Sequence, residues 1–422
     1  MRIACLGGGP AGLYFAIAMK RRQPAHEIVV VERNRPYDTF GWGVVLSDET
    51  LVNLTRSDPE SADAIRSGFV YWDDIAVFYR GTVTRSSGHG FCGIGRKRLL
   101  NILQERARTL GVTLQFETEF ENADAYREYD LVVLADGASS KTRTALAHVF
   151  KPDIDVRACK YIWLGTRQRF DDAFTFIFEE TERGWIWAHA YQFDADTATF
   201  IVECSEATWR RFGFDTMSQE EALATCERVF ARNLGGHRLA TNAAHLRGSP
   251  WLNFRRVLCE KWSHENLVLM GDAAATAHFS VGSGTKLAME SAIALAGYLH
   301  TEPSMDAAFR RYEEERRTEV LRLQSAARNS TEWFEHIERY LHLDPVQFNY
   351  SLLTRSQRIS HENLRARDKA WLEGAEMWFE EQATGVKPTT ARPTCLERLR
   401  VPKTSARRLR ASRGRAGGDS RG

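Results

Sequence analysis

The start of the chain alternates between short apolar runs and one longer helical stretch. Residues 3–6 and 28–31 are apolar runs of the length of a strand, and residues 10–19 have the apolar spacing of an amphipathic helix. A glycine-rich segment, residues 7–12, directly follows the first run and leads into the helix. The pattern therefore predicts strand, helix and strand over residues 1–35.

Helical and strand-like patterns keep alternating up to about residue 150. Residues 50–66 are predicted as one helix capped by Ser47 or Asp48, and residues 96–103 open another helix. Further strands are predicted at residues 69–93, 112–116 and 129–135. This alternation favours an α/β fold, with a mainly parallel sheet covered by helices.

The middle of the chain changes character, because its apolar runs become rich in aromatic residues. Strands are predicted there at residues 161–166, 175–179, 184–191 and 199–203. They indicate a mainly antiparallel sheet that forms a separate layer. Residues 267–270 read as one more buried strand of the first sheet, and helices are predicted at residues 218–233, 284–299 and 305–340.

The glycine-rich segment has the spacing of a dinucleotide-binding turn. Gly7, Gly9 and Gly12 form G-x-G-x-x-G between the predicted strand and helix. Gly7 permits the tight turn, Gly9 lets a pyrophosphate approach the backbone, and Gly12 lets the helix pack closely on the strand. The second apolar run ends in Glu32, 20 residues after Gly12, where a carboxylate can accept both hydroxyls of an adenosine ribose. These features predict a bound adenine dinucleotide.

Composition narrows the class of protein without naming a function. The chain has 422 residues, 43% hydrophobic and 27% charged, which suits a globular protein with more than one domain. No apolar run reaches the roughly 20 residues of a membrane helix, and the first residues do not resemble a signal peptide. The 7 cysteines are scattered without a C-x-x-C pair, which favours a reducing, cytoplasmic environment and argues against a metal centre.

The charge is unevenly distributed. Residues 383–422 hold 11 basic and 2 acidic residues, a charge of +9, so the rest of the chain carries −7. Such a basic, apolar-poor tail is expected to be disordered. It could be a nucleic-acid arm, a linker remnant or a solubilising tail. Because no aromatic residue is interleaved with its arginines, the sequence favours a protein with no nucleic-acid partner.

Two further motifs follow the glycine turn at distances of more than 100 residues. Asp136-Gly137 with Ser140 and Arg143 has the pattern D-G-x-x-S-x-x-R. Residues 271–274 read G-D-A-A, and a later G-x-G is formed by residues 282–284. With Arg96 and Leu99 as an R-x-x-L at a helix start, this set resembles the FAD-dependent aromatic hydroxylases, the single-component flavoprotein monooxygenases. Within them, residues 40–45, 160–166, 200–206 and 277–280 look most like salicylyl-CoA 5-hydroxylases and anthraniloyl-CoA monooxygenases.

The resemblance implies a Rossmann-like FAD-binding domain, a β-sheet substrate domain and C-terminal helices. It places the FAD-binding domain at residues 1–158 and 255–300, the substrate region at 69–93 and 159–254, and the helical region at 301–382, before the tail. FAD is expected to contact residues of the motifs and their neighbours: Gly7, Gly9, Pro10, Ala11, Gly12, Glu32, Arg33, Gly43, Arg96, Asp136, Gly137, Asp272, Gly282, Gly284 and Thr285.

The same resemblance implies a reaction. NADH or NADPH would bind transiently and reduce the flavin, and O₂ would then give a flavin C4a-hydroperoxide that hydroxylates an aromatic acyl-CoA. The most suitable substrate is salicylyl-CoA, whose 2-hydroxyl activates the carbon para to it, so that the product is gentisyl-CoA. His278 is the candidate catalytic residue, since it occupies a loop where the wider family usually has proline. It could hydrogen-bond a hydroxyl of the substrate or be an ordinary loop histidine.

Other residues and functions stay open at this point. Trp42, His189 and Tyr191 are candidates for substrate contact, although each could instead be a packing residue. Arg143 could serve the cofactor site or form a surface salt bridge. Anthraniloyl-CoA, tryptophan, a flavin-dependent reductase and a flavin halogenase are alternatives, although Trp185-Ile186-Trp187 is not followed by the halogenase pattern. The protein is expected to be a monomer or a homodimer with no membrane partner.

Overall fold

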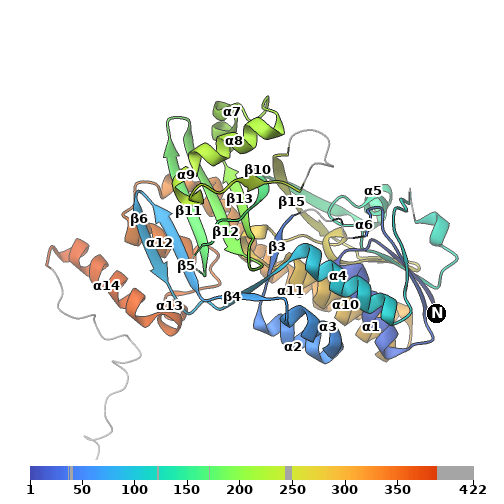
Figure 1. The fold of residues 1–422 in the computed structure, drawn as a ribbon. Coiled ribbons are helices and arrows are strands. Elements are labelled where there is room, and N and C mark those ends of the chain that lie inside the picture. The colour runs from blue at the N-terminus through green and yellow to red at the C-terminus, as the bar shows by residue number, and fades with distance from the viewer. Residues whose placement is uncertain (37, 39–40, 121–122, 171, 243–249, 387–422) are drawn as a thin grey trace, which may run out of the picture. The chain divides into compact units, whose positions relative to one another are not determined.

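The computed structural model describes residues 1–36, 38, 41–120, 123–170, 172–242 and 250–386 (Figure 1). The chain divides into two compact units, residues 1–368 and residues 369–422. In the second unit the described residues form helix α14 (Lys369–Thr384). Residues 387–422, most of the predicted basic tail, lie outside the described residues. No helix within the described residues has both the length and the apolar character that crossing a bilayer requires.

The first sheet is the parallel sheet that the apolar runs predict. Its order is β16-β17-β9-β1-β2-β8, and all neighbours are parallel except the β16–β17 pair. Its strands are β1 (Arg2–Leu6), β2 (Glu27–Val31), β8 (Thr113–Gln115), β9 (Leu131–Leu134), β16 (Ser263–His264) and β17 (Leu267–Leu269). Residues 267–269 therefore join the first sheet, as predicted. The apolar residues of β1 and β9 are fully buried, which explains why these strands read as continuous apolar runs.

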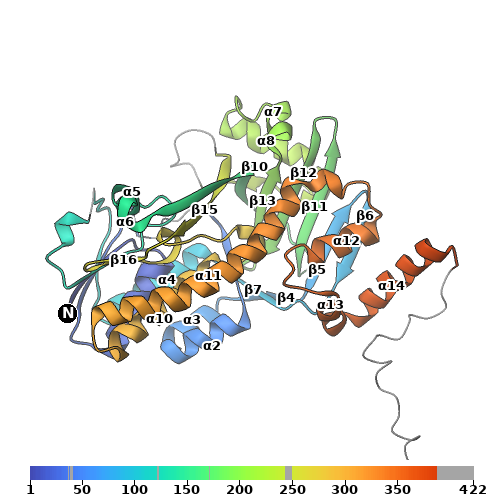
Figure 2. The ribbon, with the colours of Figure 1, turned by 180° about the vertical axis from the view of Figure 1, so that it is seen from behind.

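Helices pack beside this sheet and supply most of the rest of its core. The four largest are α1 (Pro10–Arg22), α4 (Arg96–Thr109), α10 (Gly284–Thr301) and α11 (Met305–Glu335). Helix α1 contacts both α4 and α10, and α10 in turn contacts α11. Figures 1 and 2 show these helices gathered with α2 and α3 below the parallel sheet. Their arrangement brings the starts of α1 and α10 to the same region as the ends of the strands.

The single helix predicted over residues 50–66 is in fact two helices, α2 (Asp48–Ser57) and α3 (Pro59–Arg66). The break falls at Asp58, whose carboxylate accepts from the Ser61 amide and caps α3. Pro59 is the first residue of α3, where its missing N–H costs nothing. The apolar spacing continues across both helices, so periodicity alone did not reveal the break.

The second sheet is mainly antiparallel and contains the aromatic-rich segments. Its order is β14-β10-β13-β12-β11-β5-β6, with β15 also paired to β10, and only the β5–β11 pair is parallel. The strands are β5 (Asp74–Tyr79), β6 (Thr82–Ser86), β10 (Pro152–Thr166), β11 (Ala173–Thr181), β12 (Gly184–Gln192), β13 (Ala198–Cys204), β14 (Leu239–Ala240) and β15 (Leu252–Cys259). The two sheets and their helices confirm the predicted α/β class with an additional antiparallel layer.

A small third sheet and several short helices complete the first unit. The sheet has the order β3-β7-β4, from β3 (Gly43–Leu46), β7 (Phe91–Gly95) and β4 (Val70–Trp72). The short helices are α5 (Lys141–Ala145), α6 (Ala147–Phe150), α7 (Glu206–Phe212), α8 (Gln219–Val229), α9 (Ala231–Leu234), α12 (Pro345–Thr354) and α13 (His361–Arg367). One-turn 3₁₀ helices include η2 (Gly271–Ala273) and η3 (Phe279–Val281).

Candidate active site

The three motifs meet at one edge of the parallel sheet. β1, β9 and β17 are parallel neighbours, with Leu6 opposite Leu134 and Leu134 opposite Leu269. The segments that follow these strands, which begin at Gly7, Ala135 and Met270, therefore leave the sheet side by side. The crevice outside the carboxyl ends of parallel strands is the usual ligand position in open α/β sheets. The structure thus assembles one site from segments more than 100 residues apart.

Two of the glycines are required by close backbone approach. Gly7 has φ of +120°, and a Cβ atom there would lie 2.2 Å from the carbonyl oxygen of Ala135. A Cβ on Gly12 would lie 2.1 Å from the carbonyl oxygen of Gly7. Any other residue at either position would push the turn, the strand β9 and the helix α1 apart. These contacts support the roles that the spacing predicts for both glycines.

Three other glycines border open space. At Gly9, Gly137 and Gly284, no described atom outside the local backbone lies within 4 Å of the position that a Cβ would take. Gly9 caps the N-terminus of α1 and Gly284 begins α10, so unpaired backbone N–H groups and two positive helix ends face this region. A side chain at any of these three positions would fill the open space beside the backbone. The arrangement fits a phosphate-bearing cofactor such as FAD.

Glu32 is held in place by the glycine turn itself. One carboxylate oxygen, Oε2, accepts from the Gly8 amide at 2.8 Å. The other, Oε1, accepts from the backbone and side-chain nitrogens of Asn34 at 2.8 and 2.7 Å. Oε1 thus uses both of its lone pairs, while Oε2 keeps one for a further donor such as a ribose hydroxyl. The next residue, Arg33, is exposed.

Arg143 is a buried residue that connects the Asp136-Gly137 motif to the Gly271–Ala274 motif. Its guanidinium donates to the carbonyl oxygens of Ala138, at 2.5 Å, and of Ala273, at 3.1 Å. The residue is 2% exposed, so it is not the surface salt bridge that the sequence left open. Asp136, in the same segment, accepts from the Lys141 amide through Oδ2. Its Oδ1 is buried and has no hydrogen-bond partner among the described residues.

Arg96 and Asp272 place opposite charges on the two sides of the same region. Burial lowers the pKa of Arg96, and the charge of Asp272 opposes this shift. Loss of hydration raises the pKa of Asp272, and the positive charges of Arg96 and, to a smaller extent, Arg143 oppose that rise. Asp272 nevertheless keeps an exposed surface, and Arg96 is only half-buried. Both groups are thus crowded by protein but accessible from one side, as expected of groups that face a ligand.

The remaining cofactor candidates lie along the same loops. Pro10 is the first residue of α1, and Ala11 is close enough to Gly271 that a Cβ there would lie 3.0 Å from the Ala11 methyl group. Gly282 has φ of +63° and ends η3, and Thr285 lies in the first turn of α10. The structure therefore brings all of the glycine-motif candidates to one edge.

Trp42 and Tyr191 connect the small third sheet to the aromatic sheet. The Tyr191 hydroxyl donates to the Gly43 carbonyl at 2.8 Å, and the Gly43 amide donates to Thr199 at 2.9 Å. The Trp42 indole lies over Gly165, where a Cβ would be 2.6 Å from the ring. Both candidates therefore have packing or hydrogen-bonding roles of their own, and their contact with a substrate stays a prediction.

His278 occupies the loop between η2 and η3. Its Nδ1 accepts from the Ser280 amide at 3.2 Å and lies 2.9 Å from the Ser280 hydroxyl. Burial lowers its pKa to about 4, so the ring is neutral near pH 7 and carries its proton on Nε2. The ring also contacts Phe254 and Phe279, with centroids 4.7 and 4.2 Å away. A neutral imidazole with a fixed Nε2–H can act as a hydrogen-bond donor.

His189 lies behind this loop in the aromatic sheet, and it is 1% exposed. Its Nε2 is 3.0 Å from Glu203, which also accepts from Trp187 Nε1 at 2.9 Å. Phe279, next to His278 in sequence, meets the His189 ring edge to face at 5.8 Å. Both histidine rings therefore contact Phe279, while direct contact of His189 with a substrate stays a prediction.

Glu203 is a functional candidate that the sequence motifs do not single out. It is 1% exposed and lies on β13. Burial alone would raise its pKa, but the hydrogen bonds from His189 and Trp187, with the electrostatic influence of His189 and His278, outweigh burial and lower it. Burial lowers the pKa of His189. The pair is therefore an ionised carboxylate held by a neutral imidazole. The only sequence signal was an acidic residue within an otherwise apolar strand.

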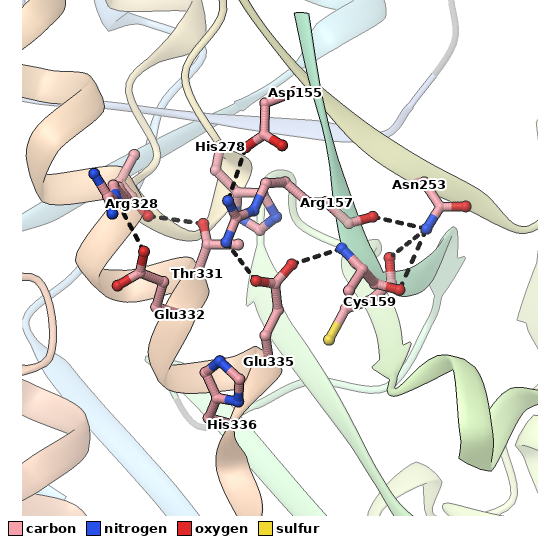
Figure 3. Close-up of polar contacts among 12 residues, drawn as sticks. Asp155, Arg157, Cys159, Asn253, His278, Arg328, Thr331, Glu332, Glu335 and His336 are labelled. Carbon is pink, nitrogen blue, oxygen red and sulfur yellow. Dashed lines mark hydrogen bonds and ion pairs between the residues drawn. The ribbon is translucent and has the colours of Figure 1, made fainter.

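A bulge in β10 fixes the strand that runs past His278. The β10–β15 register shifts between Val156 and Lys160. Asn253 donates to the carbonyl oxygens of all three bulge residues, 157–159, at 2.8 to 3.3 Å. Figure 3 shows Glu335, at the end of α11, bonded to the Arg157 guanidinium. Its other carboxylate oxygen accepts from the Ala158 amide at 2.6 Å. The Arg157 charge also helps to lower the pKa of His278.

Arg355 ties the C-terminal helices to the same loop. Its guanidinium donates to the Ser280 carbonyl oxygen at 3.0 Å and to the Ser330 hydroxyl at 2.9 Å. It lies over the rings of Phe176 and Phe334, 5.1 and 5.2 Å from their centroids. Burial lowers the pKa of Arg355 to about 10, and the negative charge of Glu203 limits that shift. The His278 loop is thus held from both the sheet and the helices.

Comparison with known proteins agrees with this geometry. The family described as FAD binding domain matches residues 1–327. The chain is 42% identical over 390 residues to a salicyloyl-CoA 5-hydroxylase of a Streptomyces species, covering 90% of this chain and 74% of that protein. It is 35% identical over 340 residues to a 3-hydroxy-4-methyl-anthranilyl-[aryl-carrier protein] 5-monooxygenase of Streptosporangium sibiricum, covering 80% and 90%.

A solved structure shows the same fold. A mutant of 2-methyl-3-hydroxypyridine-5-carboxylic acid oxygenase superposes with a TM-score of 0.66 at 21% identity, covering 88% of this chain and 99% of that one. A parallel sheet with three glycine-bearing loops at one edge, together with these matches, defines an FAD-dependent aromatic monooxygenase. The chain belongs to the FAD-binding-domain family of flavoproteins.

Proposed function

We propose that the protein hydroxylates salicylyl-CoA to gentisyl-CoA, using O₂ and NADH or NADPH. One oxygen atom of O₂ enters the ring and the other leaves as water, while the nicotinamide nucleotide is oxidised. The observation that carries the proposal is the neutral, buried His278 donor on the loop that leads into α10. The 42% identity to a salicyloyl-CoA 5-hydroxylase supports the substrate.

We assign FAD to the edge of the parallel sheet. Glu32 would hold the adenosine ribose, Gly9 and the start of α1 the pyrophosphate, and Arg96 and Asp272 the ribityl region. The N-terminus of α10, at Gly284 and Thr285, would stabilise negative charge on the flavin ring. FAD, when bound, supplies the redox chemistry with the nicotinamide nucleotide and with O₂. The protein therefore needs no nucleophile of its own and has to bind, orient and exclude water.

His278 is proposed to orient the aromatic ring. Its Nε2–H would donate to the 2-hydroxyl oxygen of salicylyl-CoA, the group that activates the carbon para to it. Because Ser280 fixes Nδ1 as the acceptor, the donor direction is set before the substrate arrives. Phe254 and Phe279 would form an apolar wall beside the ring that keeps water away from the reacting atoms.

An amine-bearing aromatic substrate is the second candidate. The relative from Streptosporangium sibiricum is named for an anthranilyl group, whose activating substituent is an amine. An Nε2–H donor at His278 suits a hydroxyl oxygen better than an aromatic amine, whose lone pair is delocalised into the ring. The geometry therefore favours the hydroxyl-bearing substrate.

The proposal is tested with the flavin-loaded protein. NADH oxidation, O₂ consumption and product formation would be followed with salicylyl-CoA, anthraniloyl-CoA, free salicylate and tryptophan, and repeated with NADPH. We expect salicylyl-CoA to stimulate NADH oxidation with nearly one product molecule for each NADH. Stimulation by free salicylate alone would refute the thioester assignment. Stimulation by anthraniloyl-CoA alone would establish the second candidate.

The role of His278 is tested by the coupling efficiency of the enzyme, which is the amount of hydroxylated product formed for each NADH oxidised. In His278→Ala the hydroxyl donor is lost, so NADH oxidation should continue while a larger share of O₂ ends as H₂O₂. His278→Gln keeps an N–H donor and should restore part of the coupling. His148→Ala, at an exposed position on α6, serves as the control. Unchanged coupling in His278→Ala would remove His278 from the mechanism.

A further inference from the structure

A cleft lies on the side of α10 next to the proposed flavin loop. This cleft has a volume of 830 Å³ and is lined mainly by α2, α10 and α11. These helices run side by side in Figures 1 and 2. The volume is within the range of small-molecule sites. Ser283, between the two flavin-loop glycines at 282 and 284, is one of its lining residues, so the cleft begins directly beside the proposed flavin site.

The lining of the cleft combines apolar side chains with an excess of cations. Leu287, Ile293 and Leu323 supply apolar surface, while six basic and four acidic residues also line it. Three of the basic residues are already paired with carboxylates: Lys286 with Glu49 at 2.6 Å, Arg316 with Glu290 at 3.3 Å and Arg322 with Glu319 at 2.7 Å.

The other three basic residues are Arg22, Arg56 and Arg358. Within the part of the chain that the structure describes, none of them has a carboxylate within 4 Å. Arg22 is half-buried, and its Nη1 donates to the Ala18 carbonyl oxygen at 3.0 Å. Burial lowers the pKa of Arg22. A partly desolvated cation without a counter-charge is costly, and a bound anion would offset that cost.

An apolar surface beside unpaired guanidinium groups matches one class of ligand. Guanidinium groups bind phosphate oxygens in bidentate fashion, and the apolar side chains offer a face for a purine ring. We propose that this cleft binds the phosphorylated adenosine portion of a nucleotide. Two nucleotides that carry this group take part in the proposed reaction, on which this inference rests: the coenzyme A thioester and the nicotinamide dinucleotide.

Basic residues near the aromatic sheet are a second possible phosphate site, but those in contact with it are already engaged. Lys160 donates to Asn253 at 2.6 Å and lies over the Trp209 ring, and Arg210 is paired with Glu206. These residues belong to β10 and α7 of the antiparallel sheet region. Arg22, Arg56 and Arg358 instead line one hollow, and none of them has a described carboxylate within 4 Å, although the charge of Arg358 helps to lower the pKa of Glu49. They are therefore the better phosphate ligands.

The test measures binding to the flavin-loaded protein by isothermal titration calorimetry, without turnover. Adenosine 3′,5′-bisphosphate represents coenzyme A, and ADP-ribose represents the nicotinamide dinucleotides. The variant is Arg56→Ala/Arg358→Ala, because both side chains are exposed and their removal should leave folding intact. Arg56→Glu is a second variant that reverses a charge. The control is Arg238→Ala/Arg310→Ala, which removes the same charge from exposed positions outside the cleft.

We expect the double variant to bind one of the two probes about tenfold or more weakly, since it loses two charge-assisted contacts. The affected probe identifies which nucleotide uses the cleft, and the control should bind both as the wild type does. Equal affinity of the variant and the wild type, or failure of both probes to bind the wild type, would overturn the inference. If salicylyl-CoA is not hydroxylated but cleft binding is lost in the variants, the proposed substrate fails while the nucleotide site stands.

Discussion

At the scale of single residues, the candidate site depends on side chains whose charge state is set by burial. His278 is neutral because it is buried, and its Nδ1 is engaged by Ser280. Glu203 is ionised although it is buried, because His189 and Trp187 donate to it. The same desolvation that would penalise an isolated charge gives each group one protonation state near pH 7.

The burial of His278 predicts a pH dependence of stability. Its folded-state pKa is about 4, against an ordinary value of 6.5, so on acidification the unfolded chain takes up the proton first. The contribution to the free energy of unfolding is constant above about pH 6.5 and falls as the pH drops towards 4, by up to about 3 kcal/mol. His278→Gln should lose less stability over this range, as measured by urea unfolding at several pH values. If the free energy of unfolding changed with pH in the same way in the wild type and the variant, this explanation would be wrong.

Glu203 should contribute to stability through its charge. In Glu203→Gln, His189 and Trp187 keep an oxygen acceptor, but Arg355 loses the opposite charge that partly compensates its burial. We expect a loss of about 1–3 kcal/mol in the free energy of unfolding. Glu206→Gln is the matched control, since Glu206 is exposed and its ion pair is with the exposed Arg210, so the change should leave stability almost unaltered. Equal effects of both changes would argue against the buried charge.

At the scale of elements, loops and helix ends rather than strands decide the geometry of the site. The parallel strands place three loops at one edge, and Arg143 then locks the second loop to the third. Asn253 and Glu335 hydrogen-bond the backbone of the β10 bulge and so fix the strand beside the His278 loop. Each connection joins elements that are distant in sequence, and the Arg143 connection also satisfies the buried carbonyl oxygen of Ala273.

The break between α2 and α3 carries its own prediction. Asp58 is fully buried, caps α3 and accepts two hydrogen bonds from Arg106 on α4, at 2.8 and 3.0 Å. Asp58→Ala would remove the cap and leave the Arg106 guanidinium without its main partner, at a cost of about 3–5 kcal/mol in the free energy of unfolding.

The control for Asp58 lies on the same helix. Asp63→Ala removes an exposed ion pair with Arg66 and should cost less than about 1 kcal/mol. Both variants would be measured by denaturant unfolding, monitored by circular dichroism. A loss below about 1 kcal/mol in Asp58→Ala would show that the ion pair does not hold α3 against α4.

At the scale of the whole molecule, every residue that we assign to the flavin, substrate or nucleotide sites lies before residue 359. The proposed sites therefore belong to the first compact unit, residues 1–368. The strongly basic segment that begins near residue 383 contributes to the net charge rather than to these sites.

Removal of residues 387–422 should leave flavin binding and coupled hydroxylation unchanged. The measurements are the flavin absorbance of the purified protein and the ratio of product to NADH consumed, each compared with the full chain. The removed segment has 11 basic and 2 acidic residues, a net charge of +9. The truncated protein should therefore elute earlier than the full chain from a cation-exchange column. A large loss of flavin or of coupling would assign the tail a part in the enzyme.

The α/β class, the positions of the parallel strands and the three loop motifs could be predicted from the amino-acid sequence, because apolar period and glycine spacing are local properties. The departure from a family pattern also marked His278. The folded chain was needed to show that Arg143 is a buried connector, that the helix over residues 50–66 breaks at Asp58, and that Glu203 faces His189. These depend on which distant groups meet in a low-dielectric interior, and the charge and hydrogen bonding of a buried side chain follow from its neighbours in space.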